Sequence, residues 1–219
     1  MKIFLSSLLS LLILTNLAAQ TENKGVYLGM NAARLIQMIG DNEKSDGINP
    51  YLIDMGYSSG KLGFRFGIGL DNSTSVNQPS AGNGETLTQR DSSKADWRFG
   101  AHYRLATYEK WQINFGVDYY QSKSSRLLLT EFTNENGEAV VDENSHDYKE
   151  SGISPCLTIQ YRPHPRVSVG TELLLRFGKH QLTEESKNSL FPASNVEIIT
   201  DGNRNYFMAP SALFICLTL

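Results

Sequence analysis

The chain is dominated by segments in which apolar and polar residues alternate one by one. In the clearest segment, Leu62, Phe64 and Phe66 share one phase, while Arg65 and Asp71 lie in the other. Strict alternation predicts a β-strand with one apolar and one polar face. Eight segments show this pattern: 26–32, 51–58, 62–71, 97–105, 111–119, 152–161, 167–177 and 212–219. Helical periodicity is not sustained over a comparable length, so the pattern predicts an all-β fold.

The connections between these segments alternate between a longer, polar type and a shorter type. In chain order they are 40–46, 58–61, 71–94, 106–110, 121–150, 162–166 and 178–204. Outer-membrane barrels have short turns at the periplasmic end and longer loops at the external end. We therefore expect an eight-stranded antiparallel up-and-down transmembrane β-barrel with both termini in the periplasm. Ten strands is the alternative, if residues 127–132 and 138–141 pair within the bilayer and not as strand extensions in water.

The two faces of the expected strands differ in a way that indicates which one is inside. The apolar face is rich in Phe, Trp, Leu and Ile and almost free of charge, as lipid contact requires. The polar face carries charged residues and many glycines, which suit a narrow interior. Aromatic residues fall near both strand ends and predict two interfacial girdles. They are Tyr57, Tyr103, Trp111 and Tyr161 toward the short turns, and Tyr51, Trp97, Tyr119 and Phe177 toward the long loops.

Charged residues of the polar face are expected to form a network in the lumen. Its predicted members are Arg65, Asp96, Arg98, Arg104, Asp118, Glu172 and Arg176, and Asp54 is a further carboxylate with which these arginines can pair. About eight strands leave an interior just wide enough for side chains. A packed, salt-bridged plug is therefore favoured over a selective pore.

The first twenty residues are typical of a secretory signal peptide. Lys2 precedes an apolar run at 3–14, and the small pair Ala18 and Ala19 follows. About 12 apolar residues are too few for the roughly 20 of a spanning helix. We predict a signal peptide at 1–19 and a single domain at 20–219.

Composition excludes some classes of protein and leaves the barrel standing. The chain has 219 residues, 10% of them aromatic, which argues against intrinsic disorder. A formal net charge of −3 argues against binding nucleic acid. The mean hydropathy of −0.30 excludes helical membrane spans but fits a barrel, in which every second strand residue meets lipid.

Residues that could carry catalysis or bind a metal are few. The four histidines show no metal-ligand spacing on one strand face, and His180 has no serine nucleophile in register. We predict no catalytic, cofactor-binding or metal site, and no cofactor. Cys156 and Cys216 lie on strands separated by a third strand, roughly 9 Å apart, beyond the about 7 Å limit for a disulfide. We therefore expect two reduced, buried thiols.

The signal peptide, the eight alternating segments and an apolar last strand resemble small outer-membrane β-barrel proteins of Gram-negative envelopes. Among these, the chain is most similar to the outer-membrane β-barrel domain family that includes PorT-like proteins. The resemblance implies a location in the cell outer membrane, contact with its lipid, and assembly by the barrel-assembly machinery. That machinery reads alternating apolar residues in the last strand, here Leu213, Ile215, Leu217 and Leu219, with Leu219 standing where Phe is usual.

The expected function is a non-enzymatic structural or interaction role in the cell envelope. The long external loops could bind an envelope protein or a surface ligand, as loops on a rigid scaffold often do. Three alternatives stay open: a narrow channel, a membrane-surface lipid-modifying enzyme, and a soluble lipocalin-like binding barrel.

Overall fold

The computed structural model describes residues 24–39, 50–77, 87–133, 138–208 and 213–219. The predicted signal peptide, 1–19, lies outside these residues. Within them, the all-β prediction is confirmed: nine antiparallel strands form one sheet, with almost no helix. The strands are β1 (Lys24–Asn31), β2 (Ile53–Ser59), β3 (Leu62–Asn77), β4 (Leu87–Tyr108), β5 (Trp111–Thr133), β6 (Ala139–His164), β7 (Val167–Asn188), β8 (Val196–Met208) and β9 (Phe214–Thr218). A short helix, α2 (Ala32–Ile39), and a 3-10 turn, η2 (Pro192–Ser194), complete the described elements.

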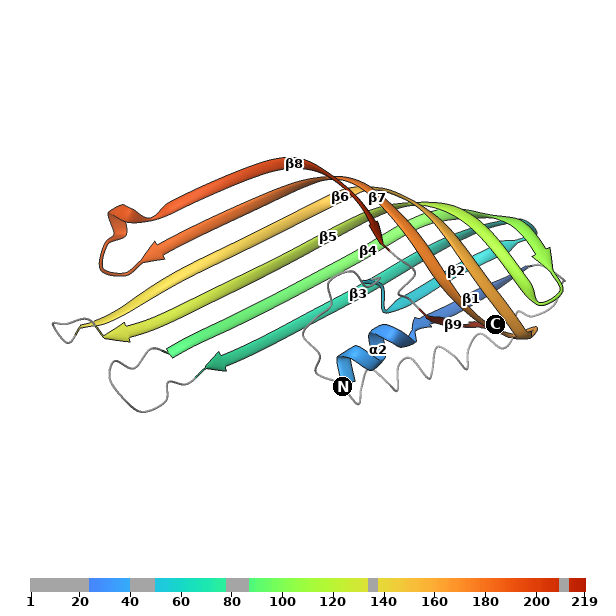
Figure 1. Ribbon diagram of the computed structural model, residues 1–219, viewed down its shortest axis with the longest axis horizontal. Helices are drawn as coiled ribbons and strands as arrows, with labels where there is room; N and C mark the ends of the chain where they lie inside the picture. The colour runs from blue at the N-terminus through green and yellow to red at the C-terminus, as the bar shows by residue number, and fades with distance from the viewer. Residues whose placement is uncertain (1–23, 40–49, 78–86, 134–137, 209–212) are drawn as a thin grey trace.

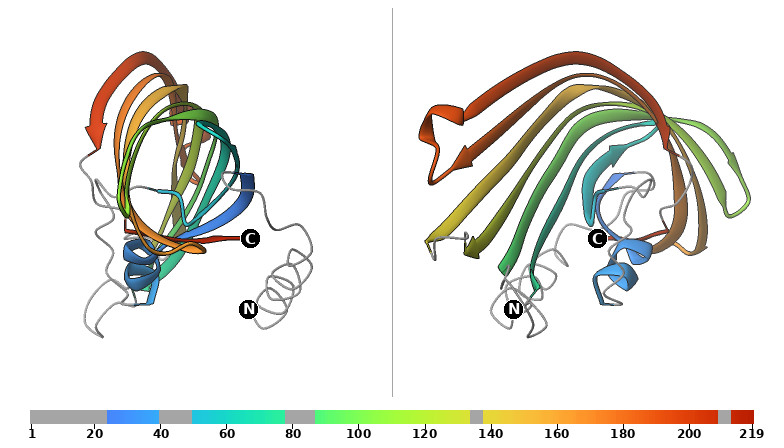
Figure 2. Two further views of the ribbon diagram at one scale, coloured as in Figure 1. Left: turned by 90° about the vertical axis from the view of Figure 1, so that its right-hand side faces the viewer. Right: turned by 60° about the vertical axis from the view of Figure 1, so that its left-hand side comes forward.

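Eight of these strands close into a ring. Strands β1 to β7 pair antiparallel with their neighbours in chain order, β7 pairs with β9, and β9 pairs with β1. The left panel of Figure 2 looks from the end that carries the β4–β5 and β6–β7 turns, and the strands there encircle a common axis. The ring therefore has the antiparallel neighbour order that the sequence predicted.

Beyond the ring, strands β3 to β7 continue and, together with β8, form an open, curved sheet (Figure 1). The prediction of long loops at 71–94, 121–150 and 178–204 is wrong in extent, because most of these residues are strand. The pairing runs on without interruption, for example from Asp71 opposite Lys94 to Asn77 opposite Thr88. In most of this sheet polar residues occupy both phases, so its strands carry no sustained period-two signal.

The same extension answers the question of eight or ten strands in the ring. Residues 127–132 pair with residues 140–145 as the continuation of β5 and β6, and form no additional ring strand. Strand β8 was not predicted. It pairs with residues 174–186 of β7, whereas β9 pairs with residues 167–170 of the same strand, nearer the turn end. The predicted last strand, 212–219, thus corresponds to β9 alone.

Within the ring, the alternation of burial follows the predicted phases. On β4, Arg98 is 1% exposed and its neighbour Phe99 is 55% exposed. Gly100 lies on the inner face, where an added Cβ would collide with an Asp118 carboxylate oxygen. Only glycine leaves room for that carboxylate, which explains why glycines share the polar phase.

Seven of the eight aromatic residues expected in the girdles lie on the outer face of the ring. Tyr57, Tyr103, Trp111, Tyr119 and Phe177 are exposed on the outer face. Trp97 and Tyr161 are half-buried there, and their rings lie 5.6 Å from Tyr119 and 5.0 Å from Trp111, respectively. Tyr51 was assigned wrongly: it is 1% exposed and lies inside, because β2 begins only at Ile53 and the period-two phase does not extend back to it.

Helix α2 was not predicted, and Ala32, expected at the end of the first strand, begins it. The side chain of Asn31 caps the helix by accepting a hydrogen bond from the Arg34 amide at 3.2 Å. The Arg34 guanidinium lies 2.6 Å from the Asp71 carboxylate on β3, which ties the helix to the sheet.

Among the described residues, no helix has both the length and the apolar character needed to cross a membrane.

Candidate functional site

Charged side chains from five strands meet inside the ring and are buried there. They are Asp54 (β2), Arg65 (β3), Arg98 (β4), Asp118 (β5) and Glu172 (β7). Each belongs to the inward phase of its strand, so the antiparallel ring brings together residues that are far apart in the sequence. We call these five residues the central cluster.

Arg65 holds two carboxylates at once. Its Nε and Nη2 donate to the two oxygens of Asp118 at 2.8 and 2.6 Å, a bidentate pair. Its Nη1 donates to Glu172, and its Nη2 also lies 2.6 Å from Cys156 Sγ. The planar guanidinium therefore links β3 to β5, β6 and β7.

Arg98 completes the central cluster from the neighbouring strand. Its Nη1 donates to Glu172 at 2.6 Å, and its Nη2 donates to Asp54 at 3.0 Å. Glu172 thus lies between two guanidinium groups, with one oxygen on each. Buried charges are tolerated when they are paired and hydrogen-bonded in this way.

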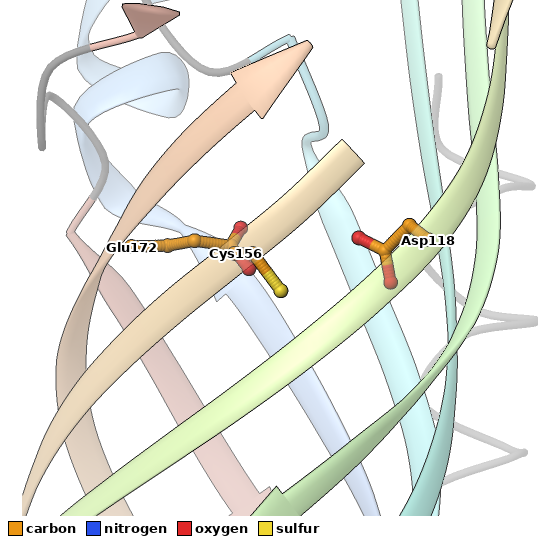
Figure 3. Close-up of side chains that lie close together, drawn as sticks. All are labelled: Asp118, Cys156 and Glu172. Carbon is orange, nitrogen blue, oxygen red and sulfur yellow. The ribbon is translucent and has the colours of Figure 1, made fainter. Parts of the chain in front are cut away.

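Asp118, Cys156 and Glu172 also have the residue types of a metal site. One ligand atom from each lies within 4.8 Å of the other two, and Figure 3 shows the three side chains converging. The Arg65 guanidinium, however, is hydrogen-bonded to all three. These three side chains already accept hydrogen bonds from the Arg65 cation, so their arrangement fits a guanidinium better than an added metal ion.

Arg176 lies beside the central cluster among aromatic rings. Its Nη2 and Nη1 donate to the hydroxyls of Tyr51 and Tyr206 at 2.8 and 3.0 Å. Its guanidinium lies 4.3 Å from the Tyr120 ring centroid, and that of Arg98 lies 4.3 Å from the Tyr51 ring. Cation–π contacts of this kind favour desolvated cations. Tyr51 therefore connects the central cluster, through Arg98, to Arg176 and its aromatic neighbours. Together these side chains fill the middle of the ring.

The structure brings the seven predicted lumen residues together only in part. Arg65, Arg98, Asp118 and Glu172 form direct ion pairs, and Arg176 contacts them through Tyr51. Asp96 is buried, with Lys94 Nζ 3.8 Å away. Arg104 lies toward the turn end and lines a cavity of about 470 Å³.

Asp54 and Cys156 also belong to the site. Asp54 lies in the polar phase of its segment and was expected to pair with an arginine of the lumen, as it does with Arg98. The contact of Cys156 with Arg65 had no signal in the sequence, because it depends on how the ring closes.

A further buried carboxylate, outside the central cluster, lies where the ring passes into the open sheet. Glu150, on β6, is 3% exposed and accepts hydrogen bonds from the hydroxyls of Tyr120 and Tyr148, both at 2.5 Å. Burial, followed by this hydrogen bond, raises the pKa of Tyr148 to about 12. Arg204 Nη1 donates to the same hydroxyl at 3.3 Å.

The two cysteines are free and buried in the described structure. Cys156 pairs with Leu174 of β7 and Cys216 pairs with Ser168 on the other side of that strand. The two positions are also offset by six residues, or roughly 20 Å, along β7, so they lie farther apart than strand order alone predicted.

The residues of the predicted assembly signal lie on or next to β9, the strand that closes the ring between β7 and β1. Leu213, Ile215 and Leu217 are exposed on the outer face, and Leu219 is half-buried. Their inward neighbours Phe214 and Cys216 are buried.

No protein-family model matches this chain, and neither does any curated protein or solved structure.

Proposed function

We propose that this chain is a transmembrane β-barrel of the cell outer membrane, with a side-chain-filled lumen and a non-enzymatic structural or interaction role in the envelope. One observation carries the proposal: the ring is apolar on its outside and charged on its inside. A ring folded for water has the reverse arrangement.

Large apolar side chains are exposed on every strand of the ring. Examples, one from each strand in ring order, are Val26, Met55, Phe64, Phe99, Phe115, Ile153, Phe177 and Ile215. A continuous apolar surface of this extent is rare on monomers in water and indicates contact with lipid or protein. A surface that runs around the whole ring favours lipid.

The length of the apolar band supports the same proposal. In β5 we take the membrane-spanning segment as Trp111 to Tyr119, and in β6 as Ile153 to Tyr161, which pair end to end. A tilted transmembrane strand needs about 9–11 residues. Aromatic residues lie at both ends of these segments, where interfacial anchors are expected.

The filled interior favours a plug over a narrow channel. Arg65 and Arg98 are fixed between carboxylates, and Arg176 is packed against Tyr51 and Tyr120. These contacts cross the ring from several strands, so an ion path would require them to separate.

The open sheet beyond the ring supports the interaction role. From Tyr120 to Thr133, β5 extends roughly 40 Å past the spanning segment. In an outer-membrane barrel the longer connections lie outside the cell, so this sheet would present its polar surface to the exterior. A rigid polar sheet offers a platform for an envelope protein or a surface ligand.

The location is tested by expressing the full chain in a Gram-negative host and isolating its outer membrane. We expect the protein in that fraction, with faster gel migration before boiling than after it. A protein recovered in the periplasmic fluid, with no heat-dependent shift, would favour the lipocalin-like alternative.

Two further measurements separate the remaining alternatives. In planar bilayers we expect no conductance steps, and steady steps would instead support a channel. The lipid of the host should keep its composition on expression, whereas a new lipid species would support an enzyme.

A further inference from the structure

The half of the ring nearest the short turns encloses a polar cavity of about 470 Å³. The central cluster forms its inner end through Asp54, Arg65, Arg98 and Glu172. Toward the turns, the cavity is lined by neutral polar side chains and by Arg104, Arg162 and Arg166. A cavity of this size admits a small organic molecule together with water.

The three outer arginines all lie near the turn end of the ring: Arg104 on β4, Arg162 near the end of β6 and Arg166 in the β6–β7 turn. The Arg104 amide donates to the Lys61 carbonyl beside the β2–β3 turn, and the Arg162 amide donates to the Lys110 carbonyl beside the β4–β5 turn. The Arg166 carbonyl, in the β6–β7 turn, accepts from the Thr218 amide of β9. Backbone hydrogen bonds thus fix the origin of each side chain around the cavity.

Charge in this cavity is unbalanced. The Asp and Glu side chains that line it are Asp54 and Glu172, and both already pair with Arg98, at 3.0 and 2.6 Å. Arg162 and Arg166 therefore add positive charge that these two carboxylates do not neutralise.

The arginines are close enough to affect one another. Arg162 follows Tyr161 and so lies beyond the membrane-spanning segment. Burial lowers the pKa of its guanidinium, and the neighbouring charge of Arg104 lowers it further. A bound anion would relieve this repulsion, and guanidinium groups bind phosphate and carboxylate in bidentate geometry.

We propose that this cavity binds a small molecule bearing a phosphate or carboxylate group, held by Arg104 and Arg162 with Arg166 at the entrance. The ligand would enter from the turn end, which is the periplasmic side if the chain spans the outer membrane. The inference requires only the folded ring, so it can hold even if the proposed membrane location does not.

The test measures binding of inorganic phosphate and of citrate to the folded full chain by calorimetry, with chloride at equal ionic strength as reference. We expect saturable binding of one or both oxyanions. In the double variant Arg104→Gln, Arg162→Gln the affinity should fall at least about tenfold, since two charge-assisted hydrogen-bonding groups are lost.

Arg90→Gln is the matched control, because it removes one arginine at the other, exposed end of β4 and should leave the affinity unchanged. Arg166→Gln, at an exposed turn position, provides the comparison if the double variant does not fold. The proposal is overturned if neither oxyanion binds saturably, or if variant and wild type bind equally well.

Discussion

Strands β3 to β7 run through both the ring and the open sheet. Their backbone pairing is the same in both regions, but their side-chain patterns differ. In the ring, outward residues of β5 such as Phe115 and Tyr119 are apolar, and inward Asp118 is buried in ion pairs. In the open sheet, the outward residues Lys123 and Ser125 of the same strand are polar and exposed. Pairing with β6 continues through both regions without a register shift.

This difference separates the cause of strand formation from the cause of side-chain patterning. Backbone hydrogen bonds between neighbours hold the strands in both regions. The side-chain pattern instead differs between the two regions: apolar side chains cover the outside of the ring, and mostly polar side chains cover the open sheet. Five predictions test this division, ordered from the largest contrast to the smallest.

Thiol labelling should give an all-or-none contrast. Cys156 and Cys216 are buried inside the ring, so a maleimide should label neither in the folded chain. In the variant Ser125→Cys the new thiol lies on the open sheet and should label fully without unfolding. Denaturation without reductant should then expose both native thiols, as shown by a mass increase of two labels. Labelling of the folded wild type would contradict the burial of the ring interior.

Removing a buried cation should cost more than removing an exposed one. Arg98→Met leaves Asp54 and Glu172 in the ring without one of their partners, and should lower the free energy of unfolding by about 3–5 kcal/mol. Arg126→Met, the same substitution at an exposed position of the open sheet, should change it by about 0.5 kcal/mol or less. Urea titration in detergent measures both.

A double-mutant cycle sharpens that comparison. Adding Asp54→Asn to Arg98→Met removes the stranded carboxylate and should restore part of the lost stability. Strictly additive losses would indicate that the two side chains are not coupled, against the 3.0 Å contact between them.

An arginine on the outer face should distinguish lipid from water. Phe115→Arg places a charge at the middle of the proposed apolar band and should destabilise the chain in lipid vesicles by about 2–4 kcal/mol. Ser125→Arg, on the same face of the same strand, should have a much smaller effect. Equal effects of the two substitutions would remove the main support for membrane insertion.

The smallest expected effect concerns Tyr148, in the open sheet. Its pKa is raised from 10.0 to about 12, chiefly by burial and then by the hydrogen bond to Glu150. Between these values the unfolded phenol is ionised and the folded one is not, so the folded state binds more protons and stability falls as pH rises. Tyr148→Phe should make this fall shallower, whereas Tyr108→Phe, at an exposed position near a turn, should not. Urea midpoints between pH 9 and pH 12 provide the measurement.

The ring was predictable from the sequence because its two faces differ in kind. Residues such as Phe64 and Arg65 alternate without error, and the glycines in the polar phase mark where inward side chains crowd. The open sheet was not predictable in this way, since Ser73, Ser92 and Ser125 suit a loop as well as a strand with two wetted faces. Its strands follow from the pairing partner that each ring strand already has.

For the site, the sequence indicated which charges face inward but not which would meet. Asp96 and Asp118 occupy equivalent phases, yet Asp118 accepts from Arg65 and Asp96 does not lie in the central cluster. That choice depends on the stagger of the ring, which single strands do not encode. Arg162 and Arg166 were missed because they flank prolines in a short connection, where no alternation marks an inward phase.

The unbroken β5–β6 ladder has a mechanical consequence. It runs from Trp111 opposite Tyr161, at the turn end, to Thr133 opposite Ala139, at the far end of the open sheet (Figure 1). If β5 were pulled at one end and β6 at the opposite end, the force would act along the strands and shear the hydrogen bonds between them. All these bonds would carry the load together, so they would have to break together. The open sheet should therefore resist sliding of its strands, because each of β5 and β6 continues directly into the ring.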